Sequence, residues 1–242
     1  MGILRTKTIE PATGSTLTLG ASGDTVTVSS DSIKANTFKD AGGNTLFTSD
    51  GAGTLSSVNS ALAPAGPILI STHTASNSSS IDITSGIDST YDEYMFVFTD
   101  INPATDQAQF TFQVNAAGGS GFNETITSTF FAAYQNEAGT NTSLGYLGEG
   151  PDQAQGTSYQ SISFNNGNGS DESCAGILHL FSPSSTTYVK HFYSEVNAYH
   201  GSNYTVDNFA AGYINTTSAI DEISFKMSSG NMDGVVQMYG IA

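Results

Sequence analysis

The sequence predicts an all-β protein, in which an N-terminal strand-and-turn segment precedes an antiparallel β-sandwich of jelly-roll type. Three observations support this fold class. Glycine, serine, threonine and asparagine are abundant and only 12% of the 242 residues are charged, which favours turns and disfavours exposed helices. Short segments that alternate apolar and polar residues recur along most of the chain, as expected for strands with one face on a core. Turn-forming residues separate these segments.

The N-terminal segment contains strands that are too poor in apolar residues to form a core alone. Leu17 and Leu19 recur nine residues later as Val26 and Val28, across the turn GASGD at 20–24. Two apolar residues per strand do not offset an ordering cost of about 1–2 kcal/mol per residue. We expect three chains to wind around one axis, so that these four residues meet their symmetry mates in a layered core. Packing against the chain's own sandwich, or against another protein, is the alternative.

Residues 60–67, SALAPAGP, separate two domains. Alanine, proline and glycine without alternation do not continue a strand, and Pro64 and Pro67 each lack a backbone donor. We therefore expect an attachment and shaft segment over residues 1–62 and a β-sandwich head over residues 67–242.

The head is predicted from segments that alternate with a period of two residues. These segments span 67–73, 79–85, 92–100, 107–115, 125–134, 158–164, 174–181, 187–199, 205–215, 222–229 and 233–241. Segment 92–100 carries apolar side chains on both faces, so it should lie in the middle of a sheet and be covered on both sides. Segment 107–115 should have one dry and one wet face, because Phe110, Phe112 and Val114 alternate with polar residues. The set predicts two packed antiparallel sheets.

The charge balance excludes one class of partner. Lys and Arg total 6 against 22 Asp and Glu, which gives a formal net charge of −16, and nucleic-acid binding needs clustered basic residues. No apolar run approaches the roughly 20 residues of a membrane helix, and the N-terminus MGILRTKTIEP lacks the features of a secretory signal. We expect no membrane insertion and synthesis in the cytoplasm.

The sequence shows no pattern typical of a catalytic, cofactor or metal site. Gly118-Gly-Ser-Gly-Phe122 departs from a nucleophile elbow at its last position, and adjacent acids such as Asp171 and Glu172 would point to opposite faces of a strand. The four histidines lack ligand spacing. Calcium could be held by Asp88 with Asp92, although these aspartates suit a turn better. Cys174, the single cysteine, lies in the apolar run CAGILHLF and should be buried.

Two loops mix aromatic residues with asparagine, glycine and acids, a composition that can bind a sugar ring. These loops are 145–152 and 199–204, and they provide the candidate glycan contacts Tyr146, Tyr199, His200 and Tyr204. The alternative is that these tyrosines pack across a sandwich corner or against a neighbouring subunit.

Several stretches resemble the small fibre and appendage proteins of tailed bacteriophages, in particular a type of virion structural protein from phages of aquatic bacteria. The stretches are IEPATGSTLTLGASGDTVTV, GIDSTYDEYMFVFTDINPATD, HLFSPSSTTYVKHFYSEV and AGYINTTSAIDEISFKMSSGNMDGVVQMYGI. The resemblance implies a trimer with an N-terminal segment attached to the virion and a β-rich head that points outward. The chain lacks the long repetitive stretch of a β-helical phage spike, so depolymerase activity does not carry over.

We therefore expect a non-enzymatic virion component: a homotrimeric, tail-fibre-like appendage without cofactors. Residues 1–62 would bind other virion proteins, and the head would adhere to a host-surface glycan or protein. Two alternatives stay open. A capsid-surface decoration protein would stabilise the particle without any receptor, and a polysaccharide-cleaving tail spike would need acidic residues from different strands or subunits to converge.

Overall fold

The computed structural model describes residues 35, 37–52, 55–56, 58–59, 66–147 and 150–241. The chain forms two compact units, Met1–Ala63 and Pro64–Ala242. All regular secondary structure of the described residues is β-strand, which confirms the all-β class. Within this part of the chain there is no helix with the length and apolar character needed to cross a membrane. The residues expected to form a trimer core, Leu17, Leu19, Val26 and Val28, lie outside the described residues.

The described part of the first unit is a small antiparallel sheet. It consists of β1 (Thr37–Lys39), β2 (Thr45–Ser49) and β3 (Leu55–Ser56), in that order. Phe38 and Phe47 lie opposite each other and their rings stack at 4.5 Å. The turn between β1 and β2 is closed by Asp40, whose Oδ1 accepts a hydrogen bond from the Asn44 backbone at 2.8 Å. None of the residues of this unit whose burial the structure describes is buried, so the apolar side chains among them remain accessible.

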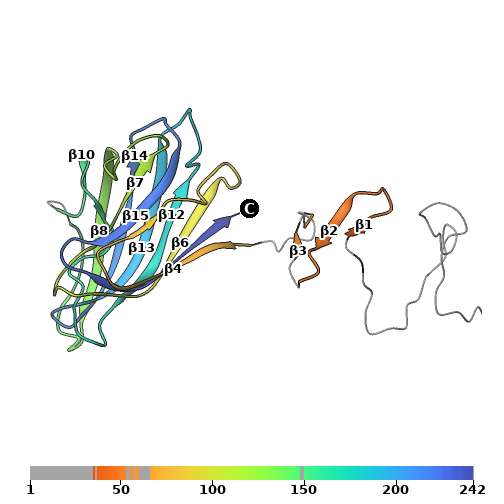
Figure 1. The fold of residues 1–242 in the computed structure, drawn as a ribbon. Coiled ribbons are helices and arrows are strands. Elements are labelled where there is room, and N and C mark those ends of the chain that lie inside the picture. Colours follow the sequence, from red (N-terminus) through yellow and green to blue (C-terminus); the bar gives the residue numbers. More distant parts are fainter. Residues whose placement is uncertain are drawn as a thin grey trace, which may run out of the picture. The chain divides into compact units, whose positions relative to one another are not determined.

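The second unit contains two antiparallel sheets, which Figure 1 shows as two curved layers. The larger sheet has nine strands in the order β10-β8-β14-β13-β12-β6-β16-β4, with β9 also paired to β8. These strands are β4 (Ile68–Ser78), β6 (Glu93–Pro103), β8 (Ile126–Asn136), β9 (Thr142–Tyr146), β10 (Ala154–Gly156), β12 (Cys174–Phe181), β13 (Lys190–His200), β14 (Tyr204–Ile214) and β16 (Met232–Ile241). The smaller sheet has the order β11-β7-β15-β5. Its strands are β5 (Ile81–Ile83), β7 (Phe110–Ala116), β11 (Gln160–Ser161) and β15 (Ile220–Met227).

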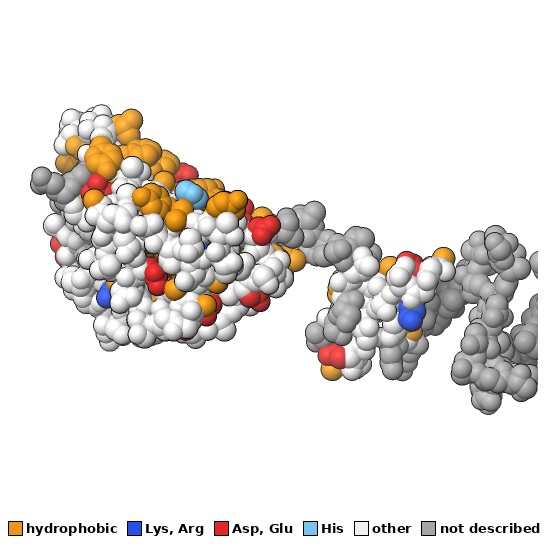
Figure 2. Space-filling view, turned by 90° about the horizontal axis from the view of Figure 1, so that it is seen from above, with side chains coloured by type: hydrophobic (Ala, Val, Ile, Leu, Met, Phe, Trp, Pro, Cys, Tyr) orange, Lys and Arg blue, Asp and Glu red, His pale blue; other side chains and the backbone are white. Residues whose placement is uncertain are grey.

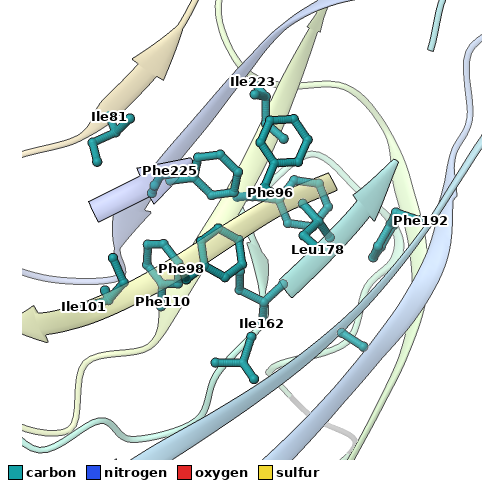
Figure 3. Packing of buried hydrophobic residues seen from close by; sticks show 14 of the residues in the cluster. Ile81, Phe96, Phe98, Ile101, Phe110, Ile162, Leu178, Phe192, Ile223 and Phe225 are labelled. Carbon is teal, nitrogen blue, oxygen red and sulfur yellow. The ribbon is translucent and has the colours of Figure 1, made fainter. Parts of the chain in front are cut away.

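Aromatic side chains from both sheets meet in the core (Figure 3). Phe98 of β6 packs against Phe110 of β7 and Phe225 of β15, with ring centroids 5.1 and 5.2 Å apart. Phe112 of β7 packs edge-to-face on Phe192 of β13 at 5.0 Å. All five rings are buried, so the inward residues of the alternating segments form the layer between the two sheets of a β-sandwich.

Each strand segment expected in the head overlaps a strand of the structure, whereas β9 and β10 were not expected. Segment 92–100 contributes to β6, which lies inside the larger sheet between β12 and β16 as expected. Only one face of β6 is covered by other side chains, however. Phe96 and Phe98 are buried, while Met95 and Val97 on the other face are only half-buried. The outward face of the larger sheet therefore lacks a second layer in the described part of this unit.

The prediction of one wet face for segment 107–115 was wrong. Every residue of β7 is buried, including the polar ones. The Gln113 side chain donates to the backbone carbonyls of Glu124, Thr157 and Ser158 at 3.0, 3.3 and 3.0 Å. The connections that contain these residues cover the outward side of the strand, and their carbonyls satisfy the buried amide.

Candidate functional site

A pocket of about 300 Å³ lies beside the turn that joins β13 to β14. β13 ends at His200 and β14 begins at Tyr204, and the turn is closed by a hydrogen bond from the Asn203 backbone to the His200 carbonyl at 2.9 Å. Asn203 has φ of +61°, a left-handed conformation that asparagine tolerates better than most residues. This tight turn holds His200 and Tyr204 side by side.

Four rings form the walls of the pocket. Tyr204 contacts Tyr134 edge-to-face at 5.5 Å and His200 at 5.7 Å, and His200 lies 6.4 Å from Phe164. The remaining lining is provided by side chains from β8, β14 and the neighbouring loops, namely Ala132, Asn141, Leu147, Ser202 and Val206. The Asn141 side chain donates to the Tyr204 hydroxyl at 3.2 Å, which fixes one wall. The result is an apolar hollow with a few polar atoms at its rim.

His200 is held in one tautomer by its own turn. The backbone N–H of Ser202 donates to Nδ1 of His200 at 3.0 Å, so the proton of the neutral ring resides on Nε2. Burial lowers the pKa of His200 below its ordinary value, and the nearby Asp106 carboxylate opposes that shift. At neutral pH the ring is therefore uncharged, and its Nε2–H has no hydrogen-bond partner among the described residues.

A second, more polar hollow of about 590 Å³ lies on the other side of the same turn. It is lined by Glu137, Asp171, Asn197 and Tyr199, among others, and Tyr204 borders both hollows. The Tyr199 hydroxyl donates to Oε1 of Glu137 at 2.9 Å, and this bond is the main cause of the raised pKa of Tyr199. No Lys or Arg occurs among the described residues that line either hollow, so this end of the molecule favours ligands without negative charge.

Comparison with known proteins gives no relative from which to transfer a site. The chain matches no protein-family model, no curated protein and no solved structure. The pocket is therefore interpreted from its own geometry.

The four candidate glycan contacts from the sequence do not form one cluster. His200 and Tyr204 lie together in the pocket, whereas Tyr199 lines only the polar hollow. Tyr146 lies elsewhere, opposite Phe131 on the outward face of the larger sheet, where its hydroxyl donates to Asp152 at 2.6 Å. It does not line the pocket, because neighbouring residues on a strand point to opposite faces and the pocket is built from Ala132 and Tyr134.

Sequence reasoning missed Tyr134, Phe164 and Asn141 as parts of the pocket. Tyr134 stands near the end of a predicted strand, and its position was a usable signal. Phe164 and Asn141 come from connections far from the β13–β14 turn in sequence. Only the strand order brings these connections to that turn.

One carboxylate of each adjacent acidic pair holds a structural hydrogen bond. Glu93 pairs with Nδ1 of His179 at 2.5 Å, Glu172 accepts the Gly169 backbone N–H at 2.7 Å, and Glu222 accepts the Asn115 amide at 2.8 Å. Asp88 caps a turn by accepting the Thr90 backbone N–H at 2.7 Å, in agreement with the turn role expected for it. No group of three or more His, Cys, Asp or Glu side chains suited to a metal ion occurs in the described residues. The aromatic walls of the pocket and the polar atoms at its rim are suited to binding a small ligand.

Proposed function

We propose that the protein is a non-enzymatic component of a bacteriophage particle, a trimeric fibre-like appendage whose head adheres to host-surface glycan. Residues 1–62 attach it to other virion proteins. The observation that carries the adhesive role is the ring-walled pocket at the β13–β14 turn, with its single oriented donor on His200.

The pocket suits one uncharged sugar ring. Its volume of about 300 Å³ is at the lower end of the range for small-ligand pockets, so it accommodates a single residue of a glycan rather than a long segment. The apolar C–H face of a pyranose packs on aromatic rings such as Tyr204 and Phe164, while its hydroxyls need donors and acceptors at the rim. His200 Nε2–H supplies a donor, and Ser202 and Asn141 supply further polar atoms.

The scarcity of basic residues in the head limits the class of glycan that the pocket can bind. Beyond residue 60 the chain contains only two basic residues, Lys190 and Lys226, and neither lines the pocket or the polar hollow. Neither the pocket nor the polar hollow offers a cation to pair with the carboxylate of an acidic sugar, and the polar hollow is itself lined by the acids Glu137 and Asp171. The proposed ligand is therefore a neutral glycan residue.

The particle role is supported by the N-terminal unit and by the resemblance of the sequence to phage appendages. The described strands of that unit have two to five residues each, and no residue of β1 or β2 is buried. Sheets of this size are not stable alone in water, so the unit needs other chains to cover it. A segment that orders on a particle, or with copies of itself, meets this need.

The test is binding of a panel of neutral methyl pyranosides, derived from glucose, galactose, mannose and N-acetylglucosamine, to the full-length chain. Chemical-shift changes in NMR spectra would report binding, with the matching glucuronide as the acidic comparison. We expect at least one neutral sugar to bind and Tyr204→Ala to weaken it about tenfold or more, as loss of a stacking ring does. Tyr188→Ala, which removes an exposed tyrosine outside the pocket, is the matched control. Binding that survives Tyr204→Ala unchanged would refute this site.

Phage particles that lack the protein distinguish an adhesive appendage from a capsid-decoration protein. Loss of adsorption to host cells supports the appendage. Normal adsorption together with reduced thermal stability of the particle would instead support the capsid-decoration alternative and contradict an adhesive head.

A further inference from the structure

The outward face of the nine-stranded sheet carries an unusually large apolar surface. Figure 2 shows hydrophobic side chains gathered along one side of the larger unit, beside a histidine. One cross-strand row on this face runs from β14 to β4 through directly paired residues. The row is Ala211, Tyr193, His179, Met95, Tyr239 and Leu69. A second row beside it pairs Tyr146, Phe131 and Phe209 across β9, β8 and β14. We call these two rows the outer aromatic face.

The rings of the outer aromatic face are pre-ordered. Phe131 and Phe209 stack at 4.9 Å with an interplanar angle of 9°, and Tyr193 stacks on His179 at 4.6 Å and 14°. His179 is itself fixed by Glu93, at 2.5 Å. Rings that are already held in place lose little conformational entropy when a partner covers them, so this surface is prepared for contact.

We propose that the outer aromatic face packs against another copy of this chain, and so forms the subunit interface of the head. This inference rests on the trimer of the proposed function and identifies the surface that the head contributes to it. It adds an interface that the sequence did not place, since the expected trimer core lay at Leu17, Leu19, Val26 and Val28.

The exposed area matches a subunit interface better than a sugar site. Tyr146 is 58% exposed, Leu69 51%, Tyr193 44% and Phe131 41%. At roughly 200 Å² per large side chain, these four residues alone leave on the order of 400 Å² of mainly apolar surface in contact with water. The half-buried members of both rows add to this value, which approaches the roughly 800 Å² that each partner covers in a standard interface. Patches of several hundred Å² on a soluble protein generally mark contact sites.

The uncovered apolar surfaces of the two units favour an identical partner. The face bears no Lys or Arg, so the contact between copies is apolar rather than a set of salt bridges, and in a trimer the outer aromatic faces of three copies turn towards the common threefold axis. The N-terminal unit independently presents uncovered apolar side chains, such as Leu55 at 54% exposure. Association of copies covers both surfaces in a single assembly, whereas a different partner for each surface would require two binding proteins.

The carboxylate of Glu195 limits how the copies meet. Glu195 pairs directly with Phe209 and therefore lies within the second row. An ionised carboxylate buried without a partner is costly, so it must lie at the rim of the contact or opposite a donor of the other copy. His191, exposed on the same face of β13, is such a donor when the copies are offset along the strand.

The experiment is the solution mass of the full-length chain and of the double variant Phe131→Asp/Tyr193→Asp, measured by light scattering across a concentration series. Both side chains are exposed in the isolated head, so the variant should fold, and circular dichroism checks this. We expect the unchanged chain to have three times the 25.1 kDa monomer mass, and the variant to associate at least a hundredfold more weakly. Tyr188→Asp changes a tyrosine outside both rows that is 72% exposed, and this control should keep the mass of the unchanged chain.

The outcomes separate the interface from the proposed function. An unchanged mass for the double variant would overturn the interface, while leaving a trimer held by residues 1–62 intact. A monomeric unchanged chain would overturn both the interface and the trimer. Neither of these results affects the sugar-binding test, which measures only the affinity of the pocket for a single sugar.

Discussion

Lys190 offers the sharpest test of how the two sheets are joined at one end of the head. It is fully buried at the start of β13, although only two basic residues occur in the head sequence. Its ammonium group donates to three backbone carbonyls: Tyr188 at 3.1 Å, Thr216 at 3.1 Å and Ser218 at 2.5 Å. Thr216 and Ser218 lie in the connection from β14 of the larger sheet to β15 of the smaller sheet. The lysine thus fastens that connection to the start of β13.

Lys190→Met retains the length of the side chain and removes the ammonium group. Two opposing terms decide the outcome. Removing a buried charge relieves its desolvation cost, but three carbonyls of half-buried or exposed residues lose a charged donor, and a hydrogen bond to a charged group contributes about 1.5–3 kcal/mol. Since all three N–H donors of the ammonium group have a carbonyl acceptor, we expect the loss of these hydrogen bonds to dominate and the free energy of unfolding to fall by about 3 kcal/mol. For a unit of this size that corresponds to a melting temperature about 10 °C lower.

Urea denaturation followed by circular dichroism measures this loss. Lys226→Met is the matched control, because the Nζ of Lys226 lies over the Tyr159 ring, 3.9 Å from its centroid, and such a contact contributes about 0.5–1 kcal/mol. Equal stability of Lys190→Met and the unchanged chain would show that the desolvation cost of the buried ammonium group cancels the gain from its three hydrogen bonds. The conclusion that Lys190 stabilises the head by holding the β14–β15 connection would then be wrong.

Three further predictions follow from burial. Burial lowers the pKa of His200 below 6.5, so as the pH falls the unfolded chain takes up a proton on this ring before the folded chain does. Stability should therefore fall as the pH drops below about 6.5, and thermal unfolding of His200→Gln should depend less on pH. Burial raises the pKa of the Cys174 thiol to about 12, so Ellman's reagent should label the chain only after denaturation, and rapid labelling of the native protein would contradict the structure. Gly176→Ala should cost about 1–3 kcal/mol by urea denaturation, since its added Cβ would collide with the backbone of Glu195 and Val196 on the paired strand.

The strands of the head could be predicted because their alternation is strong. Segment 174–181 coincides with β12, and the aromatic residues of segment 92–100 that were expected on one face all point into the core. The short β9 and β10 could not be predicted, since they carry few apolar residues and form only as additions along one edge of β8. For them, pairing with a neighbour outweighs intrinsic propensity.

The error at β7 has a tertiary cause. Gln113 and Asn115 look like residues of a wet face, because polar side chains normally mark contact with water. In the structure, connecting segments that are distant in sequence supply carbonyl acceptors to the Gln113 amide, and the side chain is fully buried. The same limit applies to the pocket: the 199–204 loop that composition indicated contributes His200 and Tyr204 to its walls, but strand order alone decided that Phe164 would join them.

The pocket and the outer aromatic face should act independently, because they use opposite sides of the same strands. On β14, Tyr204 faces the pocket, while Phe209 lies on the outer aromatic face. The double variant Phe131→Asp/Tyr193→Asp should therefore keep its affinity for a single methyl pyranoside. Its binding to a surface densely coated with the same sugar should fall by roughly a hundredfold or more, since a trimer presents three pockets and a monomer only one. If soluble and surface binding fell together, the outer aromatic face would be part of the sugar site, and the separation of adhesion from assembly would not hold.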